Sequence, residues 1–252
     1  MLEGQHPGGM GKAWLWQTSD GGRTWREHLH GKLGGYQALF CRGPRRFVLC
    51  GGFPAYGSDD GGANWRPEGF GGLLDVKQKI ATAADVRARE GYVLYALGQR
   101  QNQRRLIVSH DAGRHWSIVA IPPGAGYYRD QLFFATSDRG WIGCAEGRVL
   151  ATDDGGLTWT ARDLPTDQNI NALWFDPAGH GFAAVENSVI SRRRQTLYET
   201  ADAGRTWHAV LGGEKNVNAI FALDPHSLWA VGGVPGYVPN DLVAILIPQR
   251  QP

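Results

Sequence analysis

The sequence has few of the residues that stabilise several common classes of protein. Its 252 residues include three cysteines, two methionines and five lysines. Three cysteines cannot form a framework of several disulfides, and none has the Cys-x-x-Cys or Cys/His spacing of a zinc site. Cys41 and Cys50 fall on consecutive predicted strands, so one bridge is conceivable, but buried thiols are the favoured interpretation. We therefore expect no metal and no cofactor.

Long apolar runs are absent as well. No stretch approaches the length of a membrane-spanning helix, so no membrane span is expected. The first twelve residues lack the apolar core of a signal peptide. The default expectation is a cytoplasmic protein, with a periplasmic or extracellular location as the alternative if a leader has been removed.

Neither positive nor negative charge predominates in the sequence. The formal net charge is +2, so no nucleic-acid partner is expected. The basic residues are nonetheless uneven, with 21 arginines against five lysines. Arginine favours bidentate pairing and aromatic stacking, although a GC-rich genome produces the same bias.

What the chain does contain is glycine, tryptophan and a repeated octet. There are 36 glycines and ten tryptophans, a mixture typical of short strands joined by tight turns. Five segments read Ser/Thr-x-Asp-x-Gly-x-(Thr/Asn/His)-Trp, namely 18–25, 58–65, 109–116, 152–159 and 200–207. Their aspartates follow one another in steps of 40, 51, 43 and 48 residues. A period in this range indicates a stacked or radial repeat.

The segments between octets follow one order. An apolar strand is followed by a turn and a second strand that ends in glycine. A variable loop then leads to a third strand that ends at the octet, and a fourth strand begins at the octet's tryptophan. Four antiparallel strands per repeat predict an all-β fold, a β-propeller of four-stranded blades. The tail from residue 217 begins a further unit without an octet, and the N-terminus supplies a strand, an octet and a leaving strand. Pairing the two in one composite blade closes a ring of five blades.

Six blades is the alternative, because both 242–247 and 13–17 resemble a third strand. Either the composite blade has an extra strand or part of a larger ring is missing. The predicted domains are a flexible segment 1–11 and one propeller 12–248. The predicted blades cover about 36–68, 76–120, 130–163, 169–211, and 217–247 together with 12–30.

The octets are interpreted as structural turns. The aspartate accepts backbone hydrogen bonds across the turn, the glycines allow positive φ, and the tryptophan is expected to bury its ring between blades. A calcium loop is the alternative for the Asp-Asp-Gly-Gly sequences at 59–62 and 153–156, but the regular ligand positions and terminal glutamate of an EF-hand are missing. The structural residues are Asp20, Trp25, Asp60, Trp65, Asp111, Trp116, Asp154, Trp159, Asp202 and Trp207.

Function is expected on the face opposite the octets. The loops between second and third strands, such as 99–105 and 186–194, should lie there with the links between blades, such as 167–169. The predicted binding residues are arginines and tyrosines of these segments: Arg100, Arg104, Arg105, Tyr128, Arg129, Arg148, Arg192, Arg193, Arg194 and Tyr237. Clustered arginines suit carboxylates, phosphates or an acidic protein patch. Solvated loops without a ligand are the alternative.

The octet resembles the Asp-box (BNR) repeat, and this resemblance covers nearly the whole chain. The sequences Gly140-Trp141-Ile142-Gly143 with Thr152 to Trp159, and Trp229-Ala230-Val231-Gly232-Gly233, resemble the photosystem II assembly factors of the Ycf48/HCF136 type and their bacterial relatives. The resemblance implies a propeller with an arginine patch that acts as a non-catalytic binding scaffold. That family has seven blades and a leader, whereas the units counted here give five. The implied partner is a protein or an anionic or carbohydrate ligand, and the oligomeric state is left open.

Asp-box propellers also include sialidases and other glycoside hydrolases, which need two suitably spaced carboxylates. The candidates for this alternative are Tyr128, Asp130, Glu146, Glu186 and Asp241. The chain is short for a sialidase and no entry motif of that family is present, so the non-catalytic interpretation is favoured.

Overall fold

The computed structural model describes most of the repeated part of the chain. The described residues are 14–30, 38–42, 45–50, 56–67, 70, 73, 82–88, 91–100, 103–111, 113–119, 121, 131–186, 195–212, 216–224, 227–233 and 243–246. They contain 21 strands and, within these ranges, no α-helix. The chain divides into two compact units, Met1–Asp85 with Glu90–Ile118, and Val86–Arg89 with Val119–Pro252.

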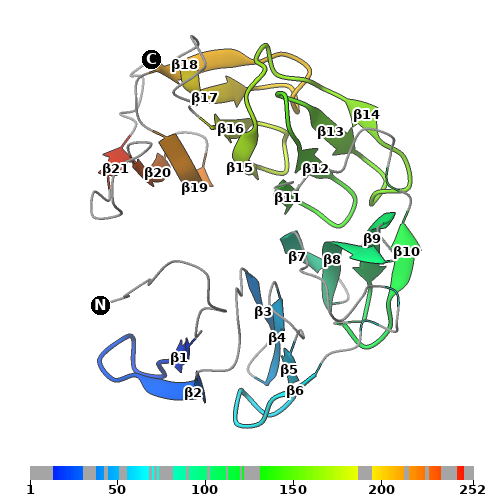
Figure 1. The fold of residues 1–252 in the computed structure, drawn as a ribbon, viewed down its shortest axis with the longest axis vertical. Helices are drawn as coiled ribbons and strands as arrows, with labels where there is room; N and C mark the ends of the chain where they lie inside the picture. The colour runs from blue at the N-terminus through cyan, green and yellow to red at the C-terminus, as the bar shows by residue number, and fades with distance from the viewer. Residues whose placement is uncertain are drawn as a thin grey trace. The chain divides into compact units, whose positions relative to one another are not determined.

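The first unit holds three antiparallel sheets (Figure 1). One is two-stranded, with β1 (Trp14–Gln17) and β2 (Arg26–His30). The next contains β3 (Ala38–Arg42), β4 (Arg46–Cys50), β5 (Tyr56–Ser58) and β6 (Arg66–Pro67). The third, which reaches the boundary with the second unit, contains β7 (Thr82–Ala88), β8 (Gly91–Arg100), β9 (Gln103–Ser109) and β10 (Ser117–Val119).

The second unit also holds three sheets, which follow one another in chain order (Figure 1). The first comprises β11 (Gln131–Phe134), β12 (Gly140–Gly143), β13 (Val149–Thr152) and β14 (Thr160–Ala161). The second comprises β15 (Ile170–Phe175), β16 (Gly181–Val185), β17 (Gln195–Thr200) and β18 (His208–Gly212). The third has β19 (Asn216–Asp224), β20 (Ser227–Gly233) and β21 (Val243–Leu246).

These sheets confirm the predicted four-stranded antiparallel repeat, which runs in chain order in each complete sheet. The structure also places β21 in the third position of the last sheet, where it pairs with β20. The composite blade and the count of five stay predictions, and segment 1–11 lies outside the described residues.

Burial explains why each sheet has this order. All residues of β12 and β13 are buried, whereas both residues of β14 are exposed. A central strand covered on both faces needs apolar or small side chains throughout, while the outermost strand tolerates polar ones. The apolar runs and polar fourth strands in the sequence follow this rule.

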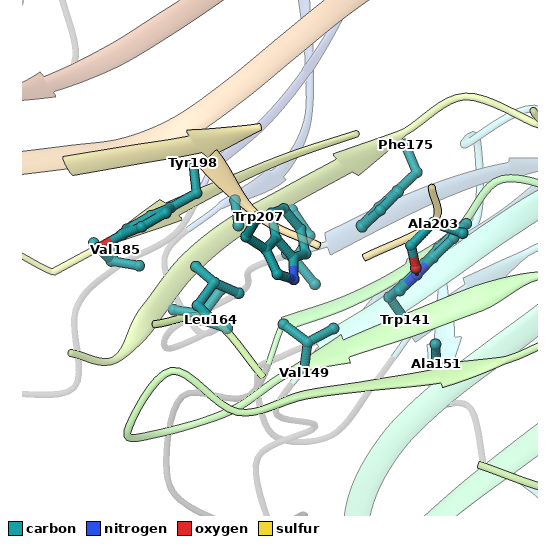
Figure 2. Close-up of a cluster of buried hydrophobic side chains, with 12 residues drawn as sticks. Trp141, Val149, Ala151, Leu164, Phe175, Val185, Tyr198, Ala203 and Trp207 are labelled. Atoms are coloured by element: carbon teal, nitrogen blue, oxygen red, sulfur yellow. The ribbon is translucent and has the colours of Figure 1, made fainter. Parts of the chain in front are cut away.

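The main core of the second unit lies between the sheets β11–β14 and β15–β18 (Figure 2). The rings of Trp141 and Phe175 stack with centroids 3.7 Å apart and an interplanar angle of 1°. Trp207 meets Phe175 edge to face at 5.9 Å. A β-carbon on Gly181 would lie 2.2 Å from the Phe175 ring, so only glycine allows this ring to lie flat over β16.

A second core joins the sheets β15–β18 and β19–β21. It contains Ala172, Phe182, Ala184 and Leu197 from one side and Val217, Ala222, Leu228 and Ala230 from the other. The two cores bury opposite faces of the middle sheet. Such stacking between successive sheets is what the radial arrangement of blades requires.

Two local predictions needed correction or sharpening. Residues 99–105 were expected to form a loop, but β8 extends to Arg100 and β9 begins at Gln103, with Gln99 paired to Arg104. The ladder between the two strands therefore extends as far as the pair Arg100 and Gln103. Cys41 pairs in register with Phe47 and Cys50 with Ala38, so these cysteines are not cross-strand partners. Cys144 is a buried thiol whose Sγ lies 3.9 Å from the Ile142 carbonyl oxygen.

Candidate binding face and the Asp-box turns

All five octets, hereafter Asp-boxes, close by the same hydrogen bonds. In the fourth, the Thr152 hydroxyl donates to Asp154 Oδ1 at 2.8 Å and accepts the Gly156 N–H at 2.8 Å. Asp154 Oδ1 also accepts the Thr158 N–H at 2.8 Å, and Oδ2 accepts the Thr158 hydroxyl at 2.5 Å. The other four boxes repeat these bonds at matching positions. In every box the aspartate accepts the bonds that close the turn, which is the arrangement that its predicted structural role requires.

These bonds keep the box carboxylates ionised. The Thr158 hydroxyl, then the Thr158 N–H and the Thr152 hydroxyl, lower the pKa of the Asp154 carboxyl from 3.8 to about 2. For Asp202, burial raises the pKa, but hydrogen bonds led by the Thr206 hydroxyl outweigh it and the pKa falls to about 2. A group with so low a pKa is a poor proton donor or base at neutral pH. The boxes therefore hold turns and are unsuited to acid–base chemistry.

The neighbouring aspartates that suggested metal loops bind arginines instead. Arg139 Nε donates a hydrogen bond to Asp153 Oδ1 at 2.9 Å, and Arg162 Nη2 donates to Asp153 Oδ2 at 3.2 Å. Asp59 is paired in the same way with Arg46 at 3.1 Å and with Arg66. In both boxes one arginine lies at or just before the start of the second strand, and the other lies in or just after the fourth strand. The doubled aspartate therefore joins strands that are distant in sequence.

The arginines of Asp153 continue into the next sheet. Arg139 Nη1 donates to the Pro177 carbonyl at 3.0 Å, and Arg162 Nη1 donates to the Ala203 carbonyl at 2.7 Å. Trp141 Nε1 donates to the same Ala203 carbonyl at 3.1 Å. The fourth and fifth boxes are thus fastened to each other across the sheet interface.

The box tryptophans fall into two groups, which corrects the prediction that all of them bury between blades. The indoles of Trp25, Trp65, Trp116 and Trp159 fold back and donate to a glycine carbonyl of their own box. Trp207 alone among the five donates elsewhere, to the Arg162 carbonyl at 3.1 Å, and is buried between sheets. The octet satisfies the indole N–H locally, so burial depends on whether a neighbouring sheet covers the ring.

Backbone bonds place the boxes beside the connections between first and second strands. Gly61 N–H donates to the Arg45 carbonyl, Gly155 N–H to the Asp138 carbonyl, and Ala203 N–H to the Gly179 carbonyl, at 2.7–2.8 Å. Each carbonyl lies in or next to the turn between the first two strands of its sheet. The predicted grouping of these segments is confirmed in three sheets.

The opposite end of the sheets is organised around the link from β14 to β15. Gly147 N–H donates to the Gln168 carbonyl at 2.7 Å, and Gln168 Nε2 donates to the Glu186 carbonyl at 2.7 Å. Glu186 N–H donates to the Asn169 carbonyl at 2.7 Å. This link therefore joins the β12–β13 turn to the start of the loop after β16, so the predicted grouping of loops and link on one face is confirmed here.

The β12–β13 turn is held tightly against the link. Gly147 has φ of +70°, and a β-carbon there would lie 2.3 Å from the Thr166 carbonyl. The preceding Glu146 adopts φ of +57°, which is uncommon for a residue with a side chain. As a result, the exposed side chains of Glu146 and Arg148 project from a turn with little freedom to move.

The described part of this face is more acidic than predicted. Arg148 is exposed and lies 3.7 Å from Asp163, and Glu186 Oε2 accepts the Asn169 side-chain amide at 3.0 Å. Asp163 is an exposed carboxylate that the sequence prediction did not include, and exposed Asp167 was placed on this face with the link 167–169 but was not named as a binding residue. Buried Thr166 was missed, and Gln168 was predicted to lie in the link but not to hold it. The polar run 166–169 between two apolar strands was the signal that could have identified them.

The remaining predicted residues are placed only in part. Arg105 is partly buried in β9, and Arg100 and Arg104 are placed as strand residues. The other predicted binding or catalytic residues lie outside the described residues: Tyr128, Arg129, Asp130, Arg192, Arg193, Arg194, Tyr237 and Asp241. Convergence of the arginines on one mouth stays a prediction. Among the described residues, no group of histidine, cysteine and carboxylate side chains is arranged to hold a metal ion.

Comparison with known proteins agrees with this architecture. Residues 108–232 match the family described as photosynthesis system II assembly factor YCF48. The chain is 25% identical over 182 residues to the photosystem II assembly lipoprotein Ycf48 of Synechococcus sp. (strain CC9902), covering 64% of this chain and 51% of that protein. The chain thus spans about half the length of this curated relative.

Solved structures show the same fold at low identity. YCF48 from Cyanidioschyzon merolae matches with a TM-score of 0.55 and 14% identity, over 85% of this chain and 71% of that one. YCF48 bound to D1 peptide matches with a TM-score of 0.54 and 15% identity, over 79% and 60%. The GH74 xyloglucanase from Xanthomonas campestris gives 0.59 and 17%, over 93% and 37%.

Together these findings confirm the resemblance to Ycf48-type Asp-box propellers. The likeness to the xyloglucanase shows the fold alone. The curated relative is a lipoprotein, which does not support the cytoplasmic expectation. Within the described residues, no helix has the length and apolarity needed to cross a membrane.

Proposed function

We propose that this chain is a non-catalytic Asp-box β-propeller that binds a segment of a partner protein and acts as an assembly factor. The observation that carries the proposal is the match of residues 108–232 to the Ycf48 assembly-factor family. A solved relative of the same fold is bound to a D1 peptide, which favours a peptide segment as the form of partner. The lipoprotein relative favours action at a membrane surface outside the cytoplasm.

The binding face is assigned to the end of the sheets opposite the boxes. The β12–β13 turn supports this, because its bond to the Gln168 carbonyl fixes exposed Glu146 and Arg148 in a preorganised arrangement. The arginines at 100, 104, 105, 129, 148 and 192–194 would bind carboxylates of the partner, and Tyr128 and Tyr237 would stack against its apolar groups. Glu146, Asp163 and Asp167 add acceptors for cations or amides. The face would then suit a peptide of mixed charge.

Five blades remain the proposed number. Four complete sheets are described, and the first and last sheets hold two and three strands. In a five-bladed ring these two sheets form one composite blade with an extra strand, because β21 already occupies the third position. Six blades is the alternative, in which each is a separate, shorter blade.

The functional test uses the full chain and an array of synthetic D1 peptides, with binding peptides measured by fluorescence anisotropy. We expect Arg148→Glu, and the triple reversal of Arg192, Arg193 and Arg194 to glutamate, to weaken binding at least about tenfold, because each reverses charge on the assigned face. Melting temperature should stay within a few degrees of the parent, since exposed charges contribute little to stability.

The matched control is Arg114→Glu, which makes the same charge change at an exposed position of an Asp-box turn. It should bind like the parent. Equal loss of binding in the control and in Arg148→Glu would show that net charge rather than the assigned face is recognised. Full binding by all variants would exclude this face.

A further inference from the structure

The first strands of the three sheets in the second unit share a polar position near their start (Figure 1). Gln131 opens β11, Asn171 is the second residue of β15, and Asn218 is the third residue of β19. The two asparagines also lie in matching sequences, Asn-Ile-Asn-Ala at 169–172 and Asn-Val-Asn-Ala at 216–219. A carboxamide therefore recurs where each apolar strand begins.

A β-bulge places Asn171 outside the regular ladder of its sheet. Ile170 pairs with Val185, and Ala172 pairs with the adjacent Ala184, so Asn171 is an extra residue between the two pairs. The extra residue also reverses the alternation of side chains. Ile170 consequently faces the core shared with the sheet β11–β14, whereas Ala172 faces the core shared with β19–β21.

The same bulge occurs in β19. Val217 pairs with Gly232, and Ala219 pairs with the adjacent Val231, which leaves Asn218 as the extra residue. Bulges are over-represented next to functional sites, where they re-aim a side chain. Two successive sheets thus hold a carboxamide at one structural position by the same irregularity.

One hydrogen bond connects the two bulges. Asn171 Nδ2 donates to the Val217 carbonyl oxygen at 3.3 Å. That carbonyl belongs to the peptide group that links Val217 to Asn218. The Asn171 carboxamide therefore already binds a backbone peptide group within the fold.

The backbone beside Asn171 is bonded to the strand end that leads into the β12–β13 turn. Ile170 N–H donates to the Cys144 carbonyl at 3.1 Å, two residues before Glu146. The Asn171 side chain is half-buried. Its carboxamide therefore lies next to the binding face assigned above, although it carries no charge.

The hydrogen-bonding capacity of Asn171 is only partly used. A carboxamide offers two N–H donors and one acceptor oxygen. Among the described residues, the one hydrogen-bond partner of the Asn171 side chain is the Val217 carbonyl, so an N–H and Oδ1 remain. A peptide group presents one C=O and one N–H, which complement this remaining donor and acceptor.

We propose that the Asn171 carboxamide binds a backbone peptide group of the partner segment, whose N–H donates to Oδ1. The inference rests on the proposed role as a binder of a protein segment, and it names a residue that recognises the backbone of that segment. This contact is independent of the partner's sequence. Charged residues such as Arg148 then select the side chains on either side of it.

The test uses the full chain and the D1 peptide that binds most tightly in the array, with affinity measured by fluorescence anisotropy. In a series of peptides, an ester oxygen replaces one backbone N–H at a time, which keeps every side chain but removes one donor. At the position that contacts Asn171, we expect the ester to weaken binding to the parent about tenfold. Asn171→Ala should bind the unaltered peptide more weakly, and the same ester should then cause no further loss. A merely structural role of Asn171 would not produce this coupling.

A second variant and a control complete the test. Asn171→Asp replaces a neutral acceptor with a charged one, so the same ester should weaken its binding more than it weakens binding to the parent. Asn64→Ala removes a carboxamide that is bonded to Asp60 in an Asp-box turn, and it should respond to every ester like the parent. Circular dichroism checks that each variant is folded.

The possible results separate this inference from the proposed function. If every ester has the same effect on the parent and on both Asn171 variants, Asn171 does not bind the backbone of the peptide. A series without any ester-sensitive position would overturn the inference as well, while peptide binding itself would stand. Failure of the parent to bind any peptide of the array would contradict the proposed function, and this inference with it.

Discussion

The first and fifth Asp-boxes have nearly the same sequence and the same turn, but they lie in different surroundings. Thr18 and Thr200 each accept a glycine N–H of their box, at 2.8 and 2.9 Å. Asp20 and Asp202 each accept the N–H of the following threonine at 2.9 and 2.8 Å. Yet Trp25 is 58% exposed whereas Trp207 is 8% exposed.

The difference shows what the octet specifies. Its polar residues close the turn by bonds within eight residues, and these form in both boxes. The tryptophan's burial depends on a neighbouring sheet. For Trp207 alone, that sheet supplies the Arg162 carbonyl as an acceptor and covers the core in which Trp207 packs on Phe175 of its own sheet. The same residues should therefore contribute differently to stability in the two boxes.

The largest difference is expected for the tryptophans. Trp207→Ala should lower the free energy of unfolding by about 3–5 kcal/mol, because it removes a buried indole and leaves a cavity. Trp25→Ala should cost less than about 1 kcal/mol, since most of its ring is already in water. Denaturant unfolding followed by circular dichroism measures both. Similar losses for the two variants would mean that the turn, and not the sheet interface, determines the contribution.

The next largest effect concerns the arginines that bind the second-position aspartates. Arg162→Met should cost about 1.5–3 kcal/mol, because a buried charged donor to the Ala203 carbonyl is lost. Arg66→Met, which removes an exposed partner of Asp59, should cost less than about 1 kcal/mol. Thermal unfolding of the pair compares them directly. A larger loss of stability in Arg66→Met than in Arg162→Met would contradict the explanation that contacts with the neighbouring sheet determine the effect.

A smaller contrast is expected for the box hydroxyls. Thr200→Val keeps the shape of the side chain but leaves the buried Gly204 N–H without its acceptor, at a cost of about 1–3 kcal/mol. Thr18→Val exposes the Gly22 N–H to water, which replaces the lost bond, so the cost should be a few tenths of a kcal/mol. Chemical unfolding of both variants, beside the parent, tests this. A destabilisation in Thr18→Val that equals that of Thr200→Val would contradict it.

Lowering the pH should reduce the stabilisation that the aspartates of all five Asp-boxes contribute to the fold. The folded pKa of Asp20 and of Asp202 is lowered from 3.8 to about 2, so the stabilisation is complete above about pH 4 and disappears as the pH falls towards 2. Melting temperatures recorded between pH 6 and pH 2 should therefore decline mainly below pH 4. Asp202→Asn should show a shallower decline than the parent, because one of the contributing carboxylates is absent. A melting temperature that is constant from pH 4 to pH 2 would argue against the contribution of these bonds.

For the candidate binding face, the sequence predicted which segments lie together but not which charges they carry. The grouping of second-to-third turns with the links between sheets follows from strand order, and the bonds of Gly147 and Glu186 to the 168–169 link agree with it. The charge of the face did not follow from strand order. The prediction of binding residues rested on the arginines in the sequence and did not include the carboxylates that lie beside them in the folded protein. Asp163 is distant from Arg148 in sequence but lies 3.7 Å away in space.

The sequence by itself determined the repeat, the four-stranded sheets and the geometry of every Asp-box turn. These features rest on contacts within eight residues or on the alternation of a single strand, so a linear pattern is enough to predict them. Tertiary structure decided which tryptophan is buried, which aspartates bind arginines, and that β21 takes the third position in the last sheet. Those outcomes depend on which surface covers another, and burial is set by groups that are distant along the chain.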